Sequence, residues 1–387
     1  MDKFRILALD GGGTWALIET MALIELFGEN ATGHEVLKNF DLAAANSGGS
    51  IVLGCLVENL KLSEILAFFL SPAKRKSIFV GKLHLPYTPK YRTAKKLQGL
   101  LAALPARGRW LLPQAANDIL ATGSGKPVHL LITSFDYDRN RGQFFRSASA
   151  SGPALGSGDP APVRLADAIH ASTDAPVLYF DRPAEFPSQP GKRYWDGGVS
   201  GYNNPVLVAV AEAVVMGQRP ESILALSIGT GTVCLPPPPA GGPPVVFYAY
   251  PAKPCFLRDL EKLAGAIVDD PPDVASFLAH VLTGGSPGLP SPVDSRVVRM
   301  SPMISPVWDA AGQWVLPQGL SQDAFKFIAN LAMDAVAQNQ VEAIRNLASL
   351  WLCDKVRNQP IRMSSGLQRE IGQDSYSQAK AAWLALQ

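Results

Sequence analysis

A single serine lies among small residues in the stretch Ala45-Asn46-Ser47-Gly48-Gly49. Residues 42–45 form an apolar run without helical spacing, which is typical of a buried parallel strand, and the apolar residues after Ser50 are spaced as in a buried helix. A strand–turn–helix corner of this kind lifts a serine hydroxyl clear of the chain, as a G-x-S-x-G elbow does. The alternative is a serine that only caps the helix, because the motif's first glycine is here Ala45.

Two further glycine-rich turns follow strand-like residues. Asp10-Gly11-Gly12-Gly13-Thr14 comes directly after an apolar run, and its glycines can present successive backbone N–H groups to an anion. Trp195-Asp196-Gly197-Gly198-Val199 places an acid on a turn that can approach another backbone closely, and Tyr202-Asn203-Asn204-Pro205 follows it. Each turn alone has common structural uses, so neither decides a function by itself.

The elements that must position these turns form an α/β pattern. Helical patterns separate several strand-like segments, at residues 4–10, 40–46, 127–136 and 223–232, which predicts a mainly parallel sheet covered on both faces. A proline run at 234–244 predicts a stiff connector between a core, residues 1–233, and a mostly helical region, residues 245–387, packed on it. In that region we expect helices at 258–268, 273–282 and 323–352, and an extended piece at 295–302.

Composition narrows the classes of function. The 387 residues carry a formal net charge of +2 and are 47% hydrophobic and 18% charged, which is typical of a globular protein; no nucleic acid polymer is expected as a partner. Four cysteines lack metal-type spacing, and neither a metal nor a cofactor is expected. The chain enters a strand almost at once, which leaves no room for a signal peptide, and no apolar run reaches the roughly 18 residues that span a bilayer. We expect a cytoplasmic protein with, at most, peripheral membrane contact.

In this order, the three turns resemble the patatin-like phospholipase family, which combines a glycine-rich oxyanion loop, a serine elbow and an Asp-Gly-Gly or Asp-Gly-Ala turn before an Asn-Pro step. Residues 133–147, 165–180 and 226–232 are also similar to family segments, so the resemblance covers roughly residues 5–233. It implies a three-layer α/β/α core. It also implies a lipid acyl hydrolase, of the phospholipase A or lysophospholipase type, that acts on phospholipid or other acyl esters.

The resemblance implies a role for each motif residue. Ser47 is the nucleophile of a Ser-Asp dyad and Asp196 is its base. The oxyanion hole is carried by Gly11, Gly12 and Gly13, and the motifs are supported by Asp10, Gly48, Gly49, Gly197 and Gly198. A dyad needs no histidine, and His170 lies in a segment with the pattern of a packed helix, so we expect it to be structural.

Two departures from the family pattern affect the site. The family's glycine loop usually continues with a hydrophobic residue, a cation and a glycine, where this chain has Thr14, Trp15 and Ala16. Trp15 then offers apolar surface in place of a charge. The elbow has Ala45 and Asn46 where Gly-Thr is usual, and a methyl group is tolerated there only if φ is negative. Since no reacting group is lost, we expect activity with an altered substrate preference.

The segment 65–117 contains ten basic residues and no acid. Positive charge interleaved with apolar patches favours contact with an anionic surface, which makes this segment the candidate for peripheral membrane contact. Alternatively, it is a solvated excursion whose counter-charges come from elsewhere in the fold. Some bacterial members of the family are switched on by a cyclic oligonucleotide; no residue here supports such an activator, and the basic segment is where one would bind.

Two other functions compete with ester hydrolysis. Residues 10–14 also resemble the D-x-G-G-T phosphate loop of actin- and hexokinase-like phosphotransferases, and the glycine turn after residue 228 resembles their nucleotide-side turn. That alternative leaves the serine and Asp-Gly-Gly turns unexplained. A catalytically inactive lipid-binding or storage module is the other possibility, and it requires Ser47 or Asp196 to be displaced from a working geometry.

Overall fold

The computed structural model describes residues 3–82, 88–147, 163–238, 245–250, 253–255, 259, 262, 266, 271–286, 295–362 and 370–387. The strands are β1 Phe4–Leu9, β2 Leu42–Ala45, β3 His129–Asp136, β4 Arg141–Arg146, β5 Tyr194–Asp196, β6 Ile223–Ile228, β7 Thr232–Val233, β8 Val297–Met300, β9 Met303–Ile304, β10 Val307–Trp308 and β11 Trp314–Val315. The helices are α1 Leu17–Phe27, α2 Gly33–Leu37, α3 Ser47–Val57, α4 Leu62–Leu70, α5 Pro72–Ile78, α6 Thr93–Ala103, α7 Leu112–Ile119, α8 Leu165–Ser172, α9 Val206–Val215, α11 Pro271–Leu282, α12 Gln322–Ala329, α13 Gln338–Leu352 and α14 Tyr376–Leu386. Short turns are η1 Gly13–Ala16, η2 Leu120–Ser124, η3 Gly197–Ser200 and η4 Pro220–Ser222.

A seven-stranded, mostly parallel sheet positions the three turns. Its order is β4-β3-β2-β1-β6-β8, and β5 also pairs with β3. All neighbours from β3 to β8 are parallel, whereas β4 and β5 run antiparallel to β3. Leu9, the last residue of β1, is in register with Ala45, the last residue of β2. The glycine loop and the serine elbow therefore leave the sheet side by side.

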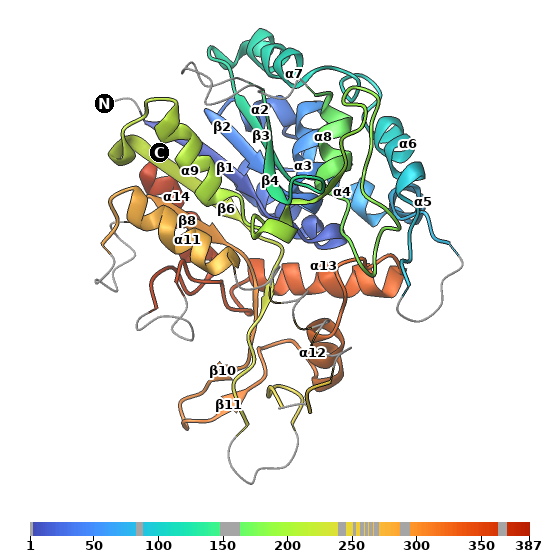
Figure 1. Cartoon of the computed structure of the whole chain (residues 1–387). Helices are drawn as coiled ribbons and strands as arrows, with labels where there is room; N and C mark the ends of the chain where they lie inside the picture. The colour runs from blue at the N-terminus through green and yellow to red at the C-terminus, as the bar shows by residue number, and fades with distance from the viewer. Residues whose placement is uncertain are drawn as a thin grey trace.

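Alternating residues of β1 face two separate cores. Leu7 and Leu9 belong to a core that includes residues of α1, α3, α8 and α13, whereas Ile6 and Ala8 pack with α9 and α11. A strand buried on both faces needs helices on both sides, and Figure 1 shows α9 and α11 on one side of the sheet and α3 and α8 on the other. This confirms the three-layer α/β/α arrangement.

The sheet continues beyond the proline run. Each predicted strand segment contains a strand (β1, β2, β3 and β6), and the extended piece expected at 295–302 contains β8, which pairs in parallel with β6. The end of the proline run, 239–244, and most of the helix expected at 258–268 lie outside the described residues. In the part of the chain that the structure describes, no helix is both long and apolar enough to cross a membrane.

The single helix predicted over 323–352 is wrong, because the structure has two helices, α12 and α13, separated by residues 330–337. We call residues 331–337 the strap. Its backbone carbonyls accept hydrogen bonds from the core instead of continuing the helical pattern: Met333 accepts from the Thr14 N–H at 3.1 Å, and Val336 accepts from the Arg75 guanidinium at 3.1 Å. These long-range bonds interrupt an otherwise helical sequence.

Candidate active site

Ser47 lies on a sharp turn between β2 and α3. Its φ is +44°, a left-handed value that is uncommon and strained for a residue with a side chain. The turn is held because the Ser47 N–H donates to the Ser172 hydroxyl at 2.8 Å and the Ser50 hydroxyl donates to the Ser47 carbonyl at 2.6 Å. The N-cap of α3 is Asn46. Ser47 is therefore not the helix cap that the sequence left open.

The elbow packs backbone to backbone against the glycine loop. A Cβ atom on Gly48 would lie 2.5 Å from the Gly13 carbonyl oxygen, and one on Gly49 would lie 2.5 Å from the Asp10 carbonyl oxygen. The Gly49 N–H donates to that same Asp10 oxygen at 3.0 Å. Both glycines are thus required by close approach. Ala45 raises no such conflict, because it is the last residue of β2.

Asp196 ends β5 and is fully buried next to the elbow. Its Oδ1 accepts hydrogen bonds from the Gly198 N–H at 2.8 Å and from the Asn46 side-chain amide at 3.0 Å. Burial raises the pKa of Asp196, and the neighbouring Ser47 hydroxyl, the hydrogen bonds from Gly198 and Asn46, and the charge of Lys96 oppose that rise. The two residues that the sequence selected therefore lie close to each other.

Asn46 is a site residue that the sequence did not single out. Its side-chain N–H group binds Asp196, and its side-chain oxygen accepts a hydrogen bond from the Thr133 hydroxyl at 2.7 Å. Gly197 leaves room for it: a Cβ atom there would lie 2.5 Å from the Asn46 oxygen. In the sequence, Asn46 was only a departure from the family's elbow. The one available signal was a polar residue at the end of a buried strand.

The three glycines of the loop differ in what their N–H groups bind. The Gly11 N–H donates to the Asn203 carbonyl at 2.8 Å, and a Cβ atom on Gly11 would lie 2.2 Å from the Asn203 side-chain oxygen. Among the described residues, the Gly12 and Gly13 N–H groups have no hydrogen-bond acceptor. Gly13 has a φ of +57°, which favours glycine. Gly12 and Gly13 are therefore the N–H groups of this loop that remain available to a ligand.

Asp10 anchors the glycine loop through an ion pair. The Arg299 guanidinium donates to both of its carboxyl oxygens, at 2.9 and 2.5 Å, and both side chains are buried. Burial raises the pKa of Asp10, and Arg299 opposes the rise. Arg299 lies on β8, so a strand from beyond the proline run supports the glycine loop.

The strap packs against the glycine loop. Thr14 binds Met333 through its backbone N–H, and the Trp15 indole N–H donates to the Ala332 carbonyl at 3.2 Å. Only 7% of Trp15 is exposed. The expectation that Trp15 offers apolar surface in place of a cation is therefore wrong, because the side chain is buried beneath the strap.

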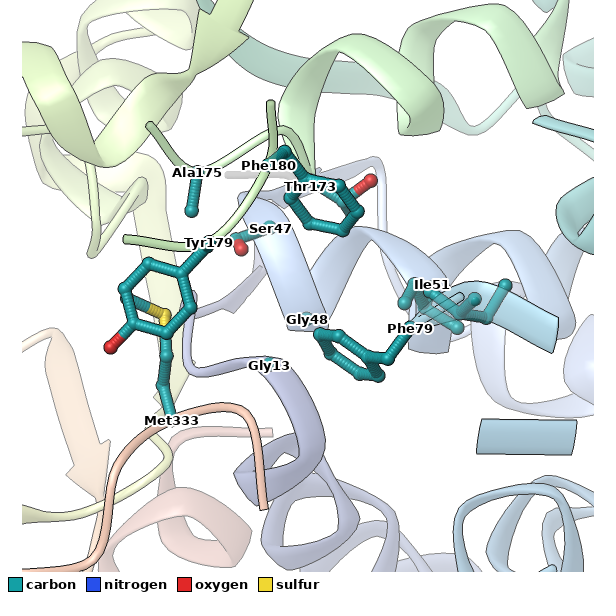
Figure 2. A pocket seen from close by; sticks show the side chains of 11 residues that line it. Gly13, Ser47, Gly48, Ile51, Phe79, Thr173, Ala175, Tyr179, Phe180 and Met333 are labelled. Carbon is teal, nitrogen blue, oxygen red and sulfur yellow. The ribbon is translucent and has the colours of Figure 1, made fainter. Parts of the chain in front are cut away.

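A narrow, mostly apolar pocket opens over Ser47. Figure 2 shows Ser47 among Tyr179, Phe79 and Phe180, with Met333 of the strap at the edge of the pocket. The free volume is about 20 Å³, which admits one or two water molecules but no acyl chain. A larger concavity, of about 750 Å³, lies at the opposite ends of β1 and β3 and contains none of the candidate residues.

His170 is buried on α8. Burial, with the nearby charges of Lys96 and Arg182, lowers the pKa of His170 well below its usual value, so the ring is neutral. Its Nδ1 has no hydrogen-bond partner among the described residues. This environment fits the structural role that we expected.

Half of the basic residues in 65–117 have partners from elsewhere in the fold. Arg75 is buried and binds main-chain carbonyls. Four others pair with acids: Lys82 with Asp181, Lys90 with Asp334, Lys96 with Asp174, and Arg107 with Asp118. The remaining five are exposed and make no ion pair within the described ranges; they are Lys74, Lys76, Arg92, Lys95 and Arg109. The charge available to an anionic partner is thus about half of what the sequence suggested.

Comparison with known proteins places this site in context. The family model described as patatin-like phospholipase matches residues 7–210. An intracellular phospholipase A2 of Caenorhabditis elegans is 27% identical over 242 residues, which is 60% of this chain and 20% of the relative, so the chain spans about a fifth of that protein. Two solved structures are similar at 11% identity. VipD from Legionella pneumophila has a TM-score of 0.38, with 90% of this chain and 67% of that chain covered, and the type III effector protein ExoU has a TM-score of 0.26, with 89% and 53% covered.

Proposed function

The chain belongs to the patatin-like phospholipase family, and on that premise we propose that it cleaves carboxylic esters of lipids with Ser47 as the nucleophile and Asp196 as its base. The observation that carries the proposal is the strained Ser47, whose hydroxyl lies close enough to the buried carboxyl group of Asp196 to lower its pKa. A strained elbow holds a nucleophile in one orientation, and a buried base faces little competing water.

In the first half of the reaction, the Ser47 oxygen attacks the ester carbonyl carbon while its proton passes to Asp196. The carbonyl oxygen becomes an oxyanion. We assign its stabilisation to the N–H groups of Gly12 and Gly13, which have no acceptor among the described residues. Collapse of the tetrahedral intermediate breaks the bond to the alcohol, which leaves with the proton from Asp196. The acyl group remains on Ser47.

In the second half, water takes the place of the alcohol. Asp196 accepts a proton from the water as its oxygen attacks the acyl carbon, and the same N–H groups stabilise the second oxyanion. The intermediate then breaks to release the fatty acid, and Ser47 recovers its proton from Asp196. The reaction uses Asp196 as its one acid–base residue in both directions. This fits a buried His170 whose pKa is lowered and whose Nδ1 has no hydrogen-bond partner among the described residues.

The contacts of Asp10 argue against the phosphotransferase alternative. In that reading Asp10 faces the phosphates of a bound nucleotide, but both of its carboxyl oxygens bind Arg299 and the side chain is buried. The inactive lipid-binding alternative is decided by experiment, because the two proposals share the same pocket and differ only in turnover.

The decisive experiment measures hydrolysis of a soluble short-chain ester and of phospholipid vesicles, with fluorophosphonate labelling of the serine in parallel. Ser47→Ala or Asp196→Asn should each lower hydrolysis by roughly 10³–10⁶-fold, and the double variant should be little worse, since the two residues act as one unit. Ser377→Ala, at an exposed serine of α14, is the matched control. A folded wild-type protein that is labelled at no serine and releases no fatty acid refutes the proposal.

A further inference from the structure

We propose that Lys96 is a positioning residue for the dyad: its buried ion pair with Asp174 supports the Asp196 turn, and it brings a positive charge to the buried surroundings of the Asp196 carboxyl group. The inference rests on the proposed function, because it assigns a cause to the state of the proposed base. Lys96 belongs to the acid-free segment that the sequence assigned to a membrane or an anionic ligand.

The ion pair is completely enclosed. The Lys96 ammonium on α6 donates to Asp174 Oδ1 at 2.5 Å, and neither side chain has any exposed surface. The ammonium also lies 4.1 Å from the ring centroid of Phe180, which lines the pocket over Ser47. Burial lowers the pKa of Lys96, and the neighbouring Asp174 and Asp196 oppose that fall. The aromatic face also stabilises a desolvated cation between an acid and the pocket wall.

Asp174 connects this pair to the dyad through the backbone. The Asp196 N–H donates to the Asp174 carbonyl at 3.1 Å. Two residues earlier, the Ser172 hydroxyl accepts from the Ser47 N–H. One short segment at the end of α8 therefore holds both the elbow and the acid turn, and Lys96 fixes that segment from behind.

The groups facing Asp196 come from four elements. The elbow contributes the Ser47 hydroxyl and the Asn46 amide, the acid's own turn contributes the Gly198 N–H, and the end of α8 contributes Asp174. α6 contributes Lys96, which among the described residues is the cation that lowers the pKa of Asp196 against the effect of burial. His170, also on α8, is neutral. Lys96 attracts negative charge on Asp196, and an ionised Asp174 repels it; burial raises the pKa of Asp174 to about 7, against the effect of Lys96.

Stability alone gives no reason for such a pair. Desolvating two ions costs several kcal/mol each, and replacing a buried ion pair by apolar residues of similar volume is often neutral or stabilising. A buried pair placed one hydrogen bond from the proposed base has a reason in the chemistry, because a nearby positive charge helps a buried aspartate to remain a proton acceptor.

The test measures kcat/KM against pH for a soluble short-chain ester in the wild type and in variants. It compares the acidic limb, the pH range in which kcat/KM falls as the pH is lowered. Lys96→Met should move the limb upward, because the attracting charge is lost. Asp174→Asn should move it downward, because the repelling charge is lost and Lys96 faces Asp196 alone. The double variant Lys96→Met with Asp174→Asn should lie between the two. A purely structural pair predicts lower stability in both single variants but no opposed shifts.

Controls keep the outcomes separate. Lys95→Met removes the same charge from an exposed position one residue away and should leave the limb in place. Lys96→Arg retains the charge if Lys96→Met does not fold, and should keep the wild-type limb. Wild-type hydrolysis through Ser47 with limbs that coincide, or that move in the same direction, overturns this inference alone. A wild-type protein that neither hydrolyses the ester nor reacts with a fluorophosphonate at Ser47 overturns both proposals.

Discussion

Asn46 donates a hydrogen bond from its side-chain amide to the carboxyl group of Asp196 at 3.0 Å, across 150 residues of chain. The elbow that presents Ser47 therefore also orients the acid that would deprotonate it. The Thr133 hydroxyl binds the other end of the amide and fixes its orientation. The elbow and the acid turn form one connected unit, although each could have been placed by separate elements.

Asn46→Ala should lower ester hydrolysis by about 10–100-fold. A hydrogen bond to a charged group contributes about 1.5–3 kcal/mol, and each 1.4 kcal/mol changes a rate about tenfold. The acidic limb of kcat/KM should also rise, since Asp196 loses a bond that lowers its pKa. The control is Asn39→Ala, because Asn39 only caps the end of α2. Unchanged kinetics in a folded Asn46→Ala protein would contradict this role.

Loosening the strap should favour bulky substrates. Asp334 pins the strap to the core by accepting from the Lys90 ammonium at 2.9 Å and the Tyr91 hydroxyl at 2.7 Å. Since the closed pocket admits no acyl chain, Asp334→Ala should raise kcat/KM for a long-chain ester by up to about tenfold relative to a short one, as the loss of about 1–2 kcal/mol of pinning increases the open population. Asp138→Ala removes an exposed ion pair to Arg193 and serves as the control. An equal fall in kcat/KM for both esters would show that the strap does not open to admit long acyl chains.

Arg299→Met should destabilise the fold strongly. It leaves the Asp10 carboxyl buried without its partner, and breaking a buried pair from one side costs about 3–5 kcal/mol. Asp10→Asn combined with Arg299→Met removes both charges and should recover part of the loss. Chemical denaturation of the two variants and the wild type measures the effect. A single variant as stable as the wild type would show that the glycine loop does not depend on β8.

Stability should fall in acid partly because of His170. Its pKa in the folded protein lies well below the unfolded value of 6.5, so below that pH the unfolded chain takes up a proton that the folded protein excludes. The contribution is fully present above pH 6.5 and is lost as the pH falls, by up to about 1.4 kcal/mol per pH unit. His170→Leu should flatten the curve of unfolding free energy between pH 7 and pH 5. Its hydrolysis at pH 7 should stay within about tenfold of the wild type; parallel stability curves would argue against a neutral, buried ring.

The exposed part of the basic segment provides the membrane test. Lys74→Gln with Lys76→Gln should weaken binding to anionic vesicles by at most about 2 kcal/mol at low salt, because each basic residue near an anionic leaflet contributes about 1 kcal/mol. The difference should shrink as salt shortens the screening length. Hydrolysis of a soluble ester should not change. Arg75 is left in place because its side chain is buried and binds Phe69 and Val336. Equal vesicle binding by the wild type and the double variant would show that this segment is solvated and does not contact the membrane.

The sequence by itself determined the architecture of the core and indicated the two residues that we propose as nucleophile and base. Apolar runs such as residues 42–45 indicate buried strands, because a strand buried on both faces must consist of apolar residues. The glycines behind Ser47 indicate a tight corner, because only small residues fit there. The order of the three turns then indicated which serine and which acid belong together. These features are local, so they can be read without knowing what lies opposite them.

The tertiary structure alone decided how each group is held and what remains free. Three features depend on contacts between segments that are far apart in the chain: the Gly11 N–H binds Asn203, Trp15 lies beneath the strap, and Lys96 pairs with Asp174. Contacts between distant segments also explain why residues 323–352 form two helices and why four of the ten basic residues in 65–117 are paired with acids. A side chain's partner is fixed by the packing of the sheet and its helices, and no local pattern records it.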